Sequence, residues 1–364
     1  MAVPGVPSGL TVQQWDDQYF KDYINRNWFK KFMGTGMGSM IQVREDLTRK
    51  VGGSITFNLV HKLTAGGAKD QNQTLEGNER EADLRSQEIT IREYSEAIRW
   101  KVYDEQLTAI DLREVNKDIL MDWNMELDKD LVIEALGQIN GVAYASASEA
   151  QKDAWLVDNA DRCLFGALKS NNSSNDHSAS LANIDTSADT LTPSALSLMK
   201  RMAKAASPKI RPYKVRNAIE NSDAFIAFVP SLVMRDLSNN ATFVQANRDA
   251  RDRGMDNPLF TGADYVWENI FIYEIEDIPV LTGVGNGGSD VAPVYLCGAQ
   301  AIGQAWAKRP TTVDETFDYK RKKGCAVIQW SKIEKLAFGT GADDTDDRKD
   351  CGVLTGFFSA AADS

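Results

Sequence analysis

The sequence predicts an α+β protein whose strands pair mainly in antiparallel fashion. A long helical pattern runs from Asp104 to Gly137, whereas Ile55–Leu59 alternates apolar and polar residues with the period of a half-buried strand. Ala224–Val229 is an uninterrupted apolar run, which is typical of a buried strand. The 364 residues, 43% of them hydrophobic, suffice for one large core or two smaller ones.

The first predicted element is a helix from Thr11 to Met33, with Thr11 as N-cap and Gly34 as its end. Aromatic and aliphatic residues recur in it at helical spacing on two adjacent stripes. Four of the aromatic residues are candidates for contacts between subunits: Trp15, Tyr19, Trp28 and Phe32. So wide an aromatic face needs a partner, and the pattern leaves open whether that partner is another subunit or the chain's own domain.

Two strand patterns, Ile55–Leu59 and Glu88–Arg92, flank a long polar segment. This segment, residues 64–86, is far longer than a hairpin turn, so we expect an extended loop that projects from the fold. Its alternating charges are candidates for ion pairs across a subunit boundary, among them Glu76, Glu79, Arg80 and Arg85. Taken alone, such charges are more typical of a solvated surface.

The next predicted element is one helix that begins with Asp104 as N-cap and ends at Gly137. At about 1.5 Å per residue it would extend for about 50 Å, which suits a spine for other layers, although a bundle helix has the same pattern. Residues 170–190 are rich in Asn, Ser and Asp and predict a surface loop or insertion outside the core.

Basic residues without any acid occur between Pro193 and Arg216. Such a patch suits a nucleic acid or an acidic neighbour, but aromatic residues for base stacking are not interleaved through it, since Tyr213 alone occurs there. A solvated helix face followed by a loop is therefore the favoured interpretation.

The C-terminal half alternates strand patterns with turns. Strands are expected at Ala224–Val229, Ile270–Ile275, Ile278–Leu281 and Val294–Leu296, and around Phe317, Val327 and Trp330. Small residues predict a helix from Ala299 to Ala307. Gly283–Gly288 matches G-x-G-x-x-G, but Pro293 and Val294 follow where a dinucleotide site needs a helix, so a hairpin loop is expected.

The composition gives little support for catalysis. The chain has two histidines, His61 and His177, which leave little material for a triad or a histidine metal site. Its four cysteines lie far apart and predict buried thiols. We therefore expect no enzymatic activity, no cofactor and no metal.

The charge and the hydropathy bear on the surroundings of the protein. With 41 basic and 52 acidic residues the formal net charge is −11, which disfavours tight binding to nucleic acid but permits a container for it. Neither a signal-peptide pattern nor an apolar window of membrane-spanning length occurs, so we expect folding in the cytoplasm and no membrane contact.

Six short motifs occur in a fixed order between about Trp15 and Val353. They are Phe29–Gly34 with Asp46 and Leu47, Gly53–Phe57, Leu75–Glu79, Asp111–Arg113, Asn257–Gly262 and Leu296–Ile302. None is specific alone, but their order and spacing together resemble the major capsid protein family of N-four-like tailed bacteriophages. Members of that family look like relatives of the Hong Kong 97-type capsid fold.

The resemblance implies a Hong Kong 97-like phage capsid fold with an N-terminal arm, an extended β-hairpin loop, a long spine helix, and peripheral and axial domains. Its implied division of the chain is 1–50 for the arm, 51–102 for the hairpin loop, 103–190 for the peripheral domain with spine helix and surface insertion, 191–305 mainly for the axial domain, and 306–364 for the return to the peripheral domain and the C-terminal tail.

The function implied by the resemblance is that of a major capsid protein. Copies would assemble in the host cytoplasm into pentamers and hexamers of an icosahedral head, which encloses double-stranded DNA as part of the virion. Portal, scaffolding and decoration proteins are the other implied partners.

Three other interpretations stay open on the sequence. An encapsulin-type compartment shell has a similar fold but houses a cargo enzyme in place of DNA. A cytoplasmic enzyme would need a deep pocket with a perturbed acid or nucleophile. A small acidic scaffold or adaptor would differ from a capsid protein only in its assembly state, because it would stay a small oligomer.

Overall fold

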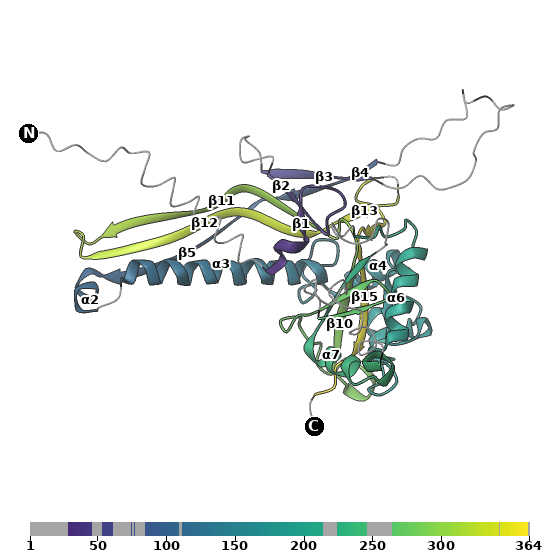
Figure 1. The fold of residues 1–364 in the computed structure, drawn as a ribbon. Coiled ribbons are helices and arrows are strands. Elements are labelled where there is room, and N and C mark those ends of the chain that lie inside the picture. The colour runs from purple at the N-terminus through teal and green to yellow at the C-terminus, as the bar shows by residue number, and fades with distance from the viewer. Residues whose placement is uncertain are drawn as a thin grey trace, which may run out of the picture.

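The structure is a computed structural model of the chain, and it describes residues 28–45, 53–60, 74, 76, 84–108, 111–213, 224–245, 264–341 and 343–362. Within these residues an elongated part projects from one side of a compact part (Figure 1). A two-stranded hairpin lies on the side of the elongated part that faces away from its long helix (Figure 1).

The elongated part is a sheet with a long helix along one face. The five strands follow the order β1-β2-β11-β12-β5. Their bounds are Met33–Gly34 for β1, Ile41–Arg44 for β2, Arg92–Lys101 for β5, Ile302–Phe317 for β11 and Lys322–Lys335 for β12. The helix is α3 (Leu112–Gly137), and the short α2 (Val102–Leu107) lies at the far end.

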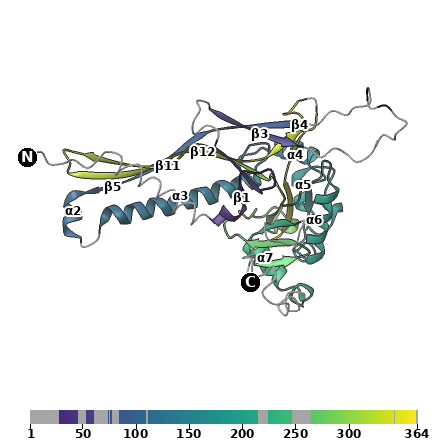
Figure 2. The ribbon, with the colours of Figure 1, turned by 45° about the horizontal axis from the view of Figure 1, so that its top comes forward.

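The compact part is a six-stranded sheet in the order β6-β15-β10-β7-β9-β8. The strands are β6 (Cys163–Phe165), β7 (Phe225–Val229), β8 (Tyr265–Trp267), β9 (Ile270–Glu274), β10 (Val291–Cys297) and β15 (Val353–Ser359). The surrounding helices are α4 (Glu149–Asp158), η3 (Lys169–Asn171), α5 (His177–Ala182), α6 (Pro193–Ala205), α7 (Ser231–Ser238) and η5 (Asn286–Gly288), several of which Figure 2 shows from above.

Two small hairpins complete the described structure. β3 (Ser54–Val60) pairs with β4 (Leu84–Thr90), so that Ile55 lies opposite Ile89. β13 (Ala337–Gly339) pairs with β14 (Arg348–Asp350). The buried side chains of β3 and β4 pack with Ala305, Leu336 and Phe338, which attaches the hairpin to the base of the elongated part.

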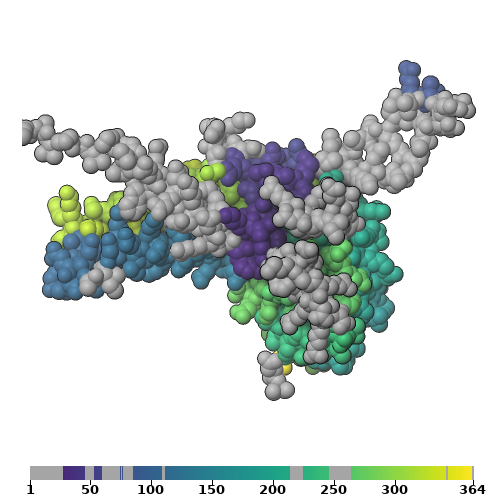
Figure 3. All heavy atoms as spheres, viewed as in Figure 1, coloured from purple at the N-terminus to yellow at the C-terminus, as the bar shows by residue number. Residues whose placement is uncertain are grey.

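The first described segment lies where the two parts meet. The 3-10 helix η1 (Trp28–Phe32) buries Phe29 and Phe32 in an apolar cluster with residues of α3, β7 and β10. Figure 3 shows this segment, in purple, between the elongated and the compact part. At about 1.5–3 kcal/mol for each fully buried large apolar side chain, this cluster contributes strongly to holding the parts together.

Several sequence predictions are confirmed. β3, β7, β9 and β10 match predicted strands, and β11 and β12 contain the strands expected around Phe317, Val327 and Trp330. The glycine-rich segment 283–288 is a loop closed by an antiparallel bridge between Leu281 and Val291, with positive φ at Gly283, Gly287 and Gly288. The fold is α+β, but both sheets are mixed, because β2 and β11, β6 and β15, and β7 and β9 pair in parallel.

The predicted helix from Asp104 to Gly137 was wrong as a single helix. α2 ends at Leu107, and α3 starts at Leu112, where the side chain of Asp111 accepts a hydrogen bond from the backbone N–H of Arg113 (2.9 Å). Asp111 is thus the N-cap of the long helix in place of Asp104.

Other element predictions failed because tertiary pairing overrode local preference. The predicted helix at 299–307 is largely β11, whose Ile302 pairs with Ile41 on one side and Lys335 on the other. Ile278–Leu281 forms no strand beyond its one bridge. Strands β5 and β15 were not predicted. Of the predicted helix 11–33, only residues 28–33 are described, and they form η1 and the start of β1.

The prediction that residues 170–190 lie outside the core was also wrong. It contains α5, and His177, Ser180, Leu181 and Ile184 are buried. The Asp189 carboxylate accepts backbone hydrogen bonds from Ala167 and Asp185 at 2.8 and 2.9 Å. The polar composition therefore serves to satisfy backbone groups of a packed segment.

Candidate assembly surfaces

Exposed apolar side chains concentrate on the elongated part. Of the eleven large apolar side chains that are exposed in the described residues, seven lie there. Trp330 lies nearer the base, opposite Glu93 at the start of β5, and we call the other six the distal surface: Tyr103, Leu107, Val115, Ile119, Val313 and Tyr319. α2 buries none of its own residues, and its Tyr103 and Leu107 are 68% and 69% exposed. Exposed apolar residues grouped on one element are typical of a surface that another protein covers.

The turn between β11 and β12 carries Tyr319, the most exposed side chain of the distal surface. Tyr319 is 100% exposed, and Asp318, Tyr319 and Lys320 have φ values of 52°, 51° and 69°. Three successive non-glycine residues in the left-handed region are uncommon and carry strain. A strained turn that holds a large aromatic side chain in solvent is typical of a contact site.

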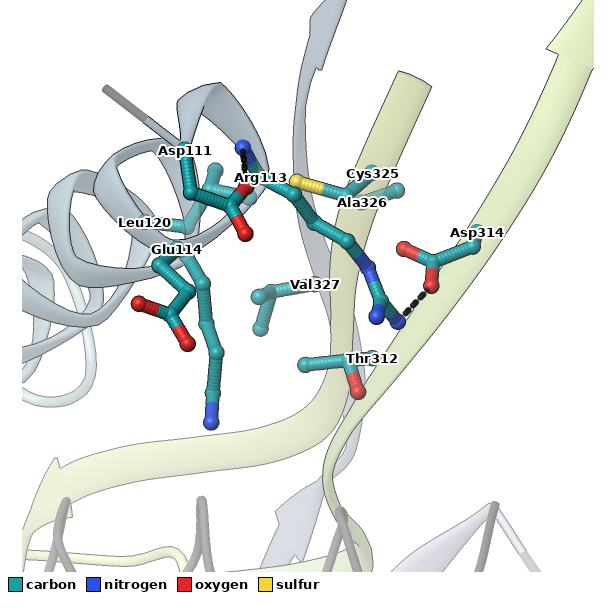
Figure 4. Close-up of a pocket in the computed structure, with 10 residues that line it drawn as sticks. Asp111, Arg113, Glu114, Leu120, Thr312, Asp314, Cys325, Ala326 and Val327 are labelled. Atoms are coloured by element: carbon teal, nitrogen blue, oxygen red, sulfur yellow. Dashed lines mark hydrogen bonds and ion pairs between the residues drawn. The ribbon is translucent and has the colours of Figure 1, made fainter. Parts of the chain in front are cut away.

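Ion pairs within the chain connect the helices to the strands at the far end of the elongated part. Lys323 on β12 pairs with Glu105 of α2 at 2.8 Å, and Arg113 at the start of α3 pairs with Asp314 on β11. Figure 4 shows Arg113 extending from the helix toward Asp314. Such exposed pairs contribute little stability each.

The cavity beside this pair is small. It measures about 70 Å³ and is lined by residues that include Asp111, Glu114, Cys325 and Val327 (Figure 4). Ligand pockets are typically several times larger. Burial raises the pKa of the Cys325 thiol, with Asp314 acting in the same direction, which makes it a poor nucleophile.

A buried polar network joins the elongated part to the compact part. Lys335, the last residue of β12, pairs with Asp350 of β14 at 2.7 Å, and their side chains are 3% and 2% exposed. Arg162, itself 1% exposed, donates to the backbone carbonyl of Asp350 at 2.8 Å. Asn159 accepts from the backbone N–H of Asp350 at 2.8 Å. The network ties the end of the long hairpin to the compact sheet.

His177 is packed among aromatic rings. Its ring centroid lies 5.5 Å from that of Phe357 and 6.0 Å from that of Phe165, and its Nε2 is 3.2 Å from the Tyr144 hydroxyl. Burial lowers the pKa of His177, and Glu149 acts in the opposite direction. Within the described ranges, no group of three or more His, Cys, Asp or Glu residues is placed to hold a metal ion.

The structure separates the residues that the sequence predicted as subunit contacts. Phe32 is buried in the chain's own apolar cluster, and Trp28, 39% exposed, packs 5.9 Å from Tyr273 and 6.2 Å from Phe228. Arg85 donates to the backbone carbonyl of Gly341 at 3.3 Å, and Glu76 is exposed. Trp15, Tyr19, Glu79 and Arg80 lie outside the described residues.

Sequence reasoning missed the distal surface. Leu107 and Ile119 were counted as ordinary members of a helical pattern, because periodicity does not show which face stays uncovered, and Tyr103 belonged to no predicted element. The one available signal was Tyr319, an aromatic residue between the charged Asp318 and Lys320 in a turn.

The architecture defines the class of protein. A sheet backed by a long helix projects from a compact mixed domain, and a hairpin extends from its base. The same shape occurs in the capsid asymmetric unit of cyanophage Pam1, with a TM-score of 0.79 and 29% identity over all of both chains. The capsid of Ralstonia phage GP4 has a TM-score of 0.74 at 19% identity, covering 100% of this chain and 96% of that one. The fold is thus that of shell-forming capsid proteins of the Hong Kong 97 type.

Sequence comparison gives the family. The profile described as phage capsid protein matches residues 4–356, and the chain belongs to this family of structural proteins, which are not enzymes. The major capsid protein of Pseudomonas phage KPP25 is 25% identical over 372 aligned residues, which cover 96% of each chain. In the described ranges no helix is long and apolar enough to cross a membrane.

Proposed function

We propose that this chain is the major capsid protein of a tailed phage and assembles into the icosahedral head that encloses its double-stranded DNA. The observation that carries the proposal is the distal surface, which an isolated chain leaves in water and a neighbouring copy can cover. The proposal is also supported by sequence comparison, because this chain matches a relative named major capsid protein over nearly the full length of both chains.

The two parts of the structure suggest separate roles in the shell. The compact part corresponds to the axial domain, which gathers in pentamers and hexamers, and the elongated part corresponds to the peripheral domain with α3 as spine helix. β6 and β15 pair within the compact sheet, so the axial domain takes segments from residues 103–190 and 306–364 in addition to 191–305. Head-to-tail contacts between such subunits close into rings.

The N-terminal arm, residues 1–50, and the hairpin loop, residues 51–102, are proposed to reach neighbouring copies. Trp15 and Tyr19 on the arm, and Glu76, Glu79 and Arg80 on the loop, are the proposed contact residues. Within the loop segment, Ser86 of β4 donates to Asp344 at 2.7 Å, which fixes the base from which the loop departs. Arg85, the residue before Ser86, donates to the backbone carbonyl of Gly341 at 3.3 Å.

Further partners follow from a capsid role: a portal, and scaffolding or decoration proteins. DNA would be enclosed without sequence-specific contacts, because the chain carries a net charge of −11 and a repulsive wall does not trap the genome. Assembly in the host cytoplasm and residence in the virion belong to the same proposal.

Electron microscopy with sedimentation of the expressed protein tests this function. The full chain is expected to form closed shells or rings, and the chain truncated before Lys50 is expected to lose them. A monomer or dimer at every concentration would contradict assembly by this chain. Shells that package an enzyme and no DNA would favour the encapsulin-type alternative, which has weaker support because the matching family and relative are phage capsid proteins.

A further inference from the structure

A cleft lies where the elongated part meets the compact part. Its volume is about 780 Å³, within the range of roughly 300–1,000 Å³ that ligand pockets occupy. Ile133 and Gly137 of α3 form one wall, and the loops at 143–146 and 279–281 form the others. The cleft therefore opens beside the helix that spans the elongated part.

The surface of the cleft is mainly apolar. Its floor contains Trp155, Tyr295 and Phe357, which are buried, and its rim contains the exposed Pro279 and the half-buried Leu281. The Tyr295 hydroxyl points to Gly137, where a Cβ atom would lie 2.9 Å from it. Grooves lined by aromatic rings bind extended proline-containing segments, and Tyr144 is a half-buried aromatic residue that this cleft offers to an occupant.

The charges at the cleft disfavour an anionic occupant. Both lysines that line it are already paired with carboxylates of this chain, Lys152 with Glu149 at 3.8 Å and Lys335 with Asp350 at 2.7 Å. No unpaired cation among the described lining residues is left for a phosphate or a carboxylate. The lining also includes the carboxylates of Asp130, Glu134 and Asp277, of which Asp277 pairs with Lys129. An apolar segment without acidic side chains therefore fits the surface better.

The chain contains one such segment outside the described residues. Residues 3–12 read Val-Pro-Gly-Val-Pro-Ser-Gly-Leu-Thr-Val, and no charged side chain occurs before Asp16. Pro4 and Pro7 have P-x-x-P spacing, which favours the extended polyproline II conformation and lowers the entropy lost on binding.

The described chain begins close to the cleft. Phe29 and Phe32 of η1 share an apolar cluster with Ile133 and Tyr295, both of which line the cleft. Residues 13–27 connect the apolar segment to η1. These 15 residues span about 22 Å as part of the helix predicted from Thr11 to Met33 and up to about 50 Å when fully extended. The extended span suits a cleft on a neighbouring copy.

We propose that residues 3–12 of one copy bind the cleft of a neighbouring copy in the assembled shell. The inference rests on the proposed function, since it requires neighbours. It assigns the cleft to a segment of this chain and gives the N-terminal arm a defined site of attachment.

Disulfide cross-linking in the full chain tests the proposal. Val6→Cys is combined with Ala145→Cys, an exposed position that lines the cleft, and the purified shells are oxidised mildly and separated on a non-reducing gel. The matched control combines Val6→Cys with Ala150→Cys, an exposed position that does not line the cleft. Val6→Cys alone measures any reaction with the natural cysteines. If the first pair folds poorly, Ser146→Cys replaces Ala145→Cys.

The expected result is conversion of the monomer band into covalent dimers and larger multimers with Ala145→Cys, and little conversion in the control. Shells in which both pairs cross-link equally, or neither does, overturn the proposed site while the capsid function stands. A faster-moving monomer without multimers places the segment in its own chain's cleft and overturns the exchange between copies. Absence of shells in the unaltered protein overturns the proposed function and this inference together.

Discussion

At the scale of single residues, Asp128 is the buried carboxyl of the long helix. It is 1% exposed and faces Gln329 of β12. It lies between two apolar clusters of the helix–sheet interface, one with Leu120 and Val327 and the other with Val132 and Ile333. Burial raises the pKa of Asp128 to about 7, and the hydrogen bond with the Gln329 side chain acts in the opposite direction.

This raised pKa makes stability depend on pH. Because the folded state holds the proton up to about pH 7 and the unfolded chain loses it near pH 4, the free energy of unfolding falls as pH rises between these values. Asp128→Asn removes this loss, so above pH 7 the variant should be more stable by up to ~4 kcal/mol, with little difference near pH 4. Urea unfolding across this range measures the effect.

Asp130→Asn is the matched control, because Asp130 is exposed on the same helix. It should leave the pH profile of stability unchanged. Parallel profiles for the wild type and Asp128→Asn would contradict the assignment of the titrating group to Asp128.

Individual residue roles were the least predictable from the sequence. The aromatic spacing of Trp28 and Phe32 was visible, but the cluster that buries Phe32 includes Phe228 and Tyr273, which lie far along the chain. The charge of Arg85 was likewise visible, whereas its partners Gly341 and Asp344 depend on where the β13–β14 turn lies. Spacing identifies a face, and only the fold shows what covers it.

At the scale of elements, the joint between β12 and β14 depends on the pair Lys335–Asp350. Lys335→Met leaves the Asp350 carboxylate buried and without its cation, which should lower the free energy of unfolding by about 3–5 kcal/mol. The double variant Lys335→Met with Asp350→Leu removes both charges and should recover most of that loss. Denaturant titration of the three proteins measures both changes.

Recovery of stability in the double variant distinguishes an unpaired buried charge from lost packing as the cause of the destabilisation. A double variant as unstable as Lys335→Met alone would show that packing of the lysine stem, and not the unpaired charge, causes the loss. Lys349→Met is the control, since Lys349 of the same strand pairs at 3.7 Å with Asp161, whose side chain is 33% exposed, so that its loss leaves no fully buried charge.

Elements with a strong local signal were predictable, and those fixed by distant pairing were not. β7 has five buried apolar residues in a row, and β3 alternates cleanly, so both follow from sequence. β11 begins with small residues that suit a helix, and it is a strand because β2 and β12 pair with both its edges. The break between α2 and α3 depends on which of two aspartates acts as cap, a choice that periodicity does not make.

At the scale of the whole molecule, the sequence motifs predicted the capsid fold, but the distribution of exposed apolar residues needed the structure. The far end of the elongated part combines Tyr103 and Leu107 of α2 with Tyr319 at the β11–β12 turn. A monomer gains nothing from these side chains in water, whereas a shell can bury them at every contact between subunits.

Tyr319→Ser tests this account of assembly. Tyr319 is fully exposed, so the variant should fold with unchanged stability. Loss of an aromatic anchor at an interface typically costs more than about 1 kcal/mol per contact, which should raise the protein concentration needed for shells by about fivefold or more. Light scattering and sedimentation against concentration measure that threshold. Leu168→Ser, at a 60% exposed position outside the distal surface, should leave it unchanged; equal thresholds for both variants would place the contacts between subunits elsewhere on the chain.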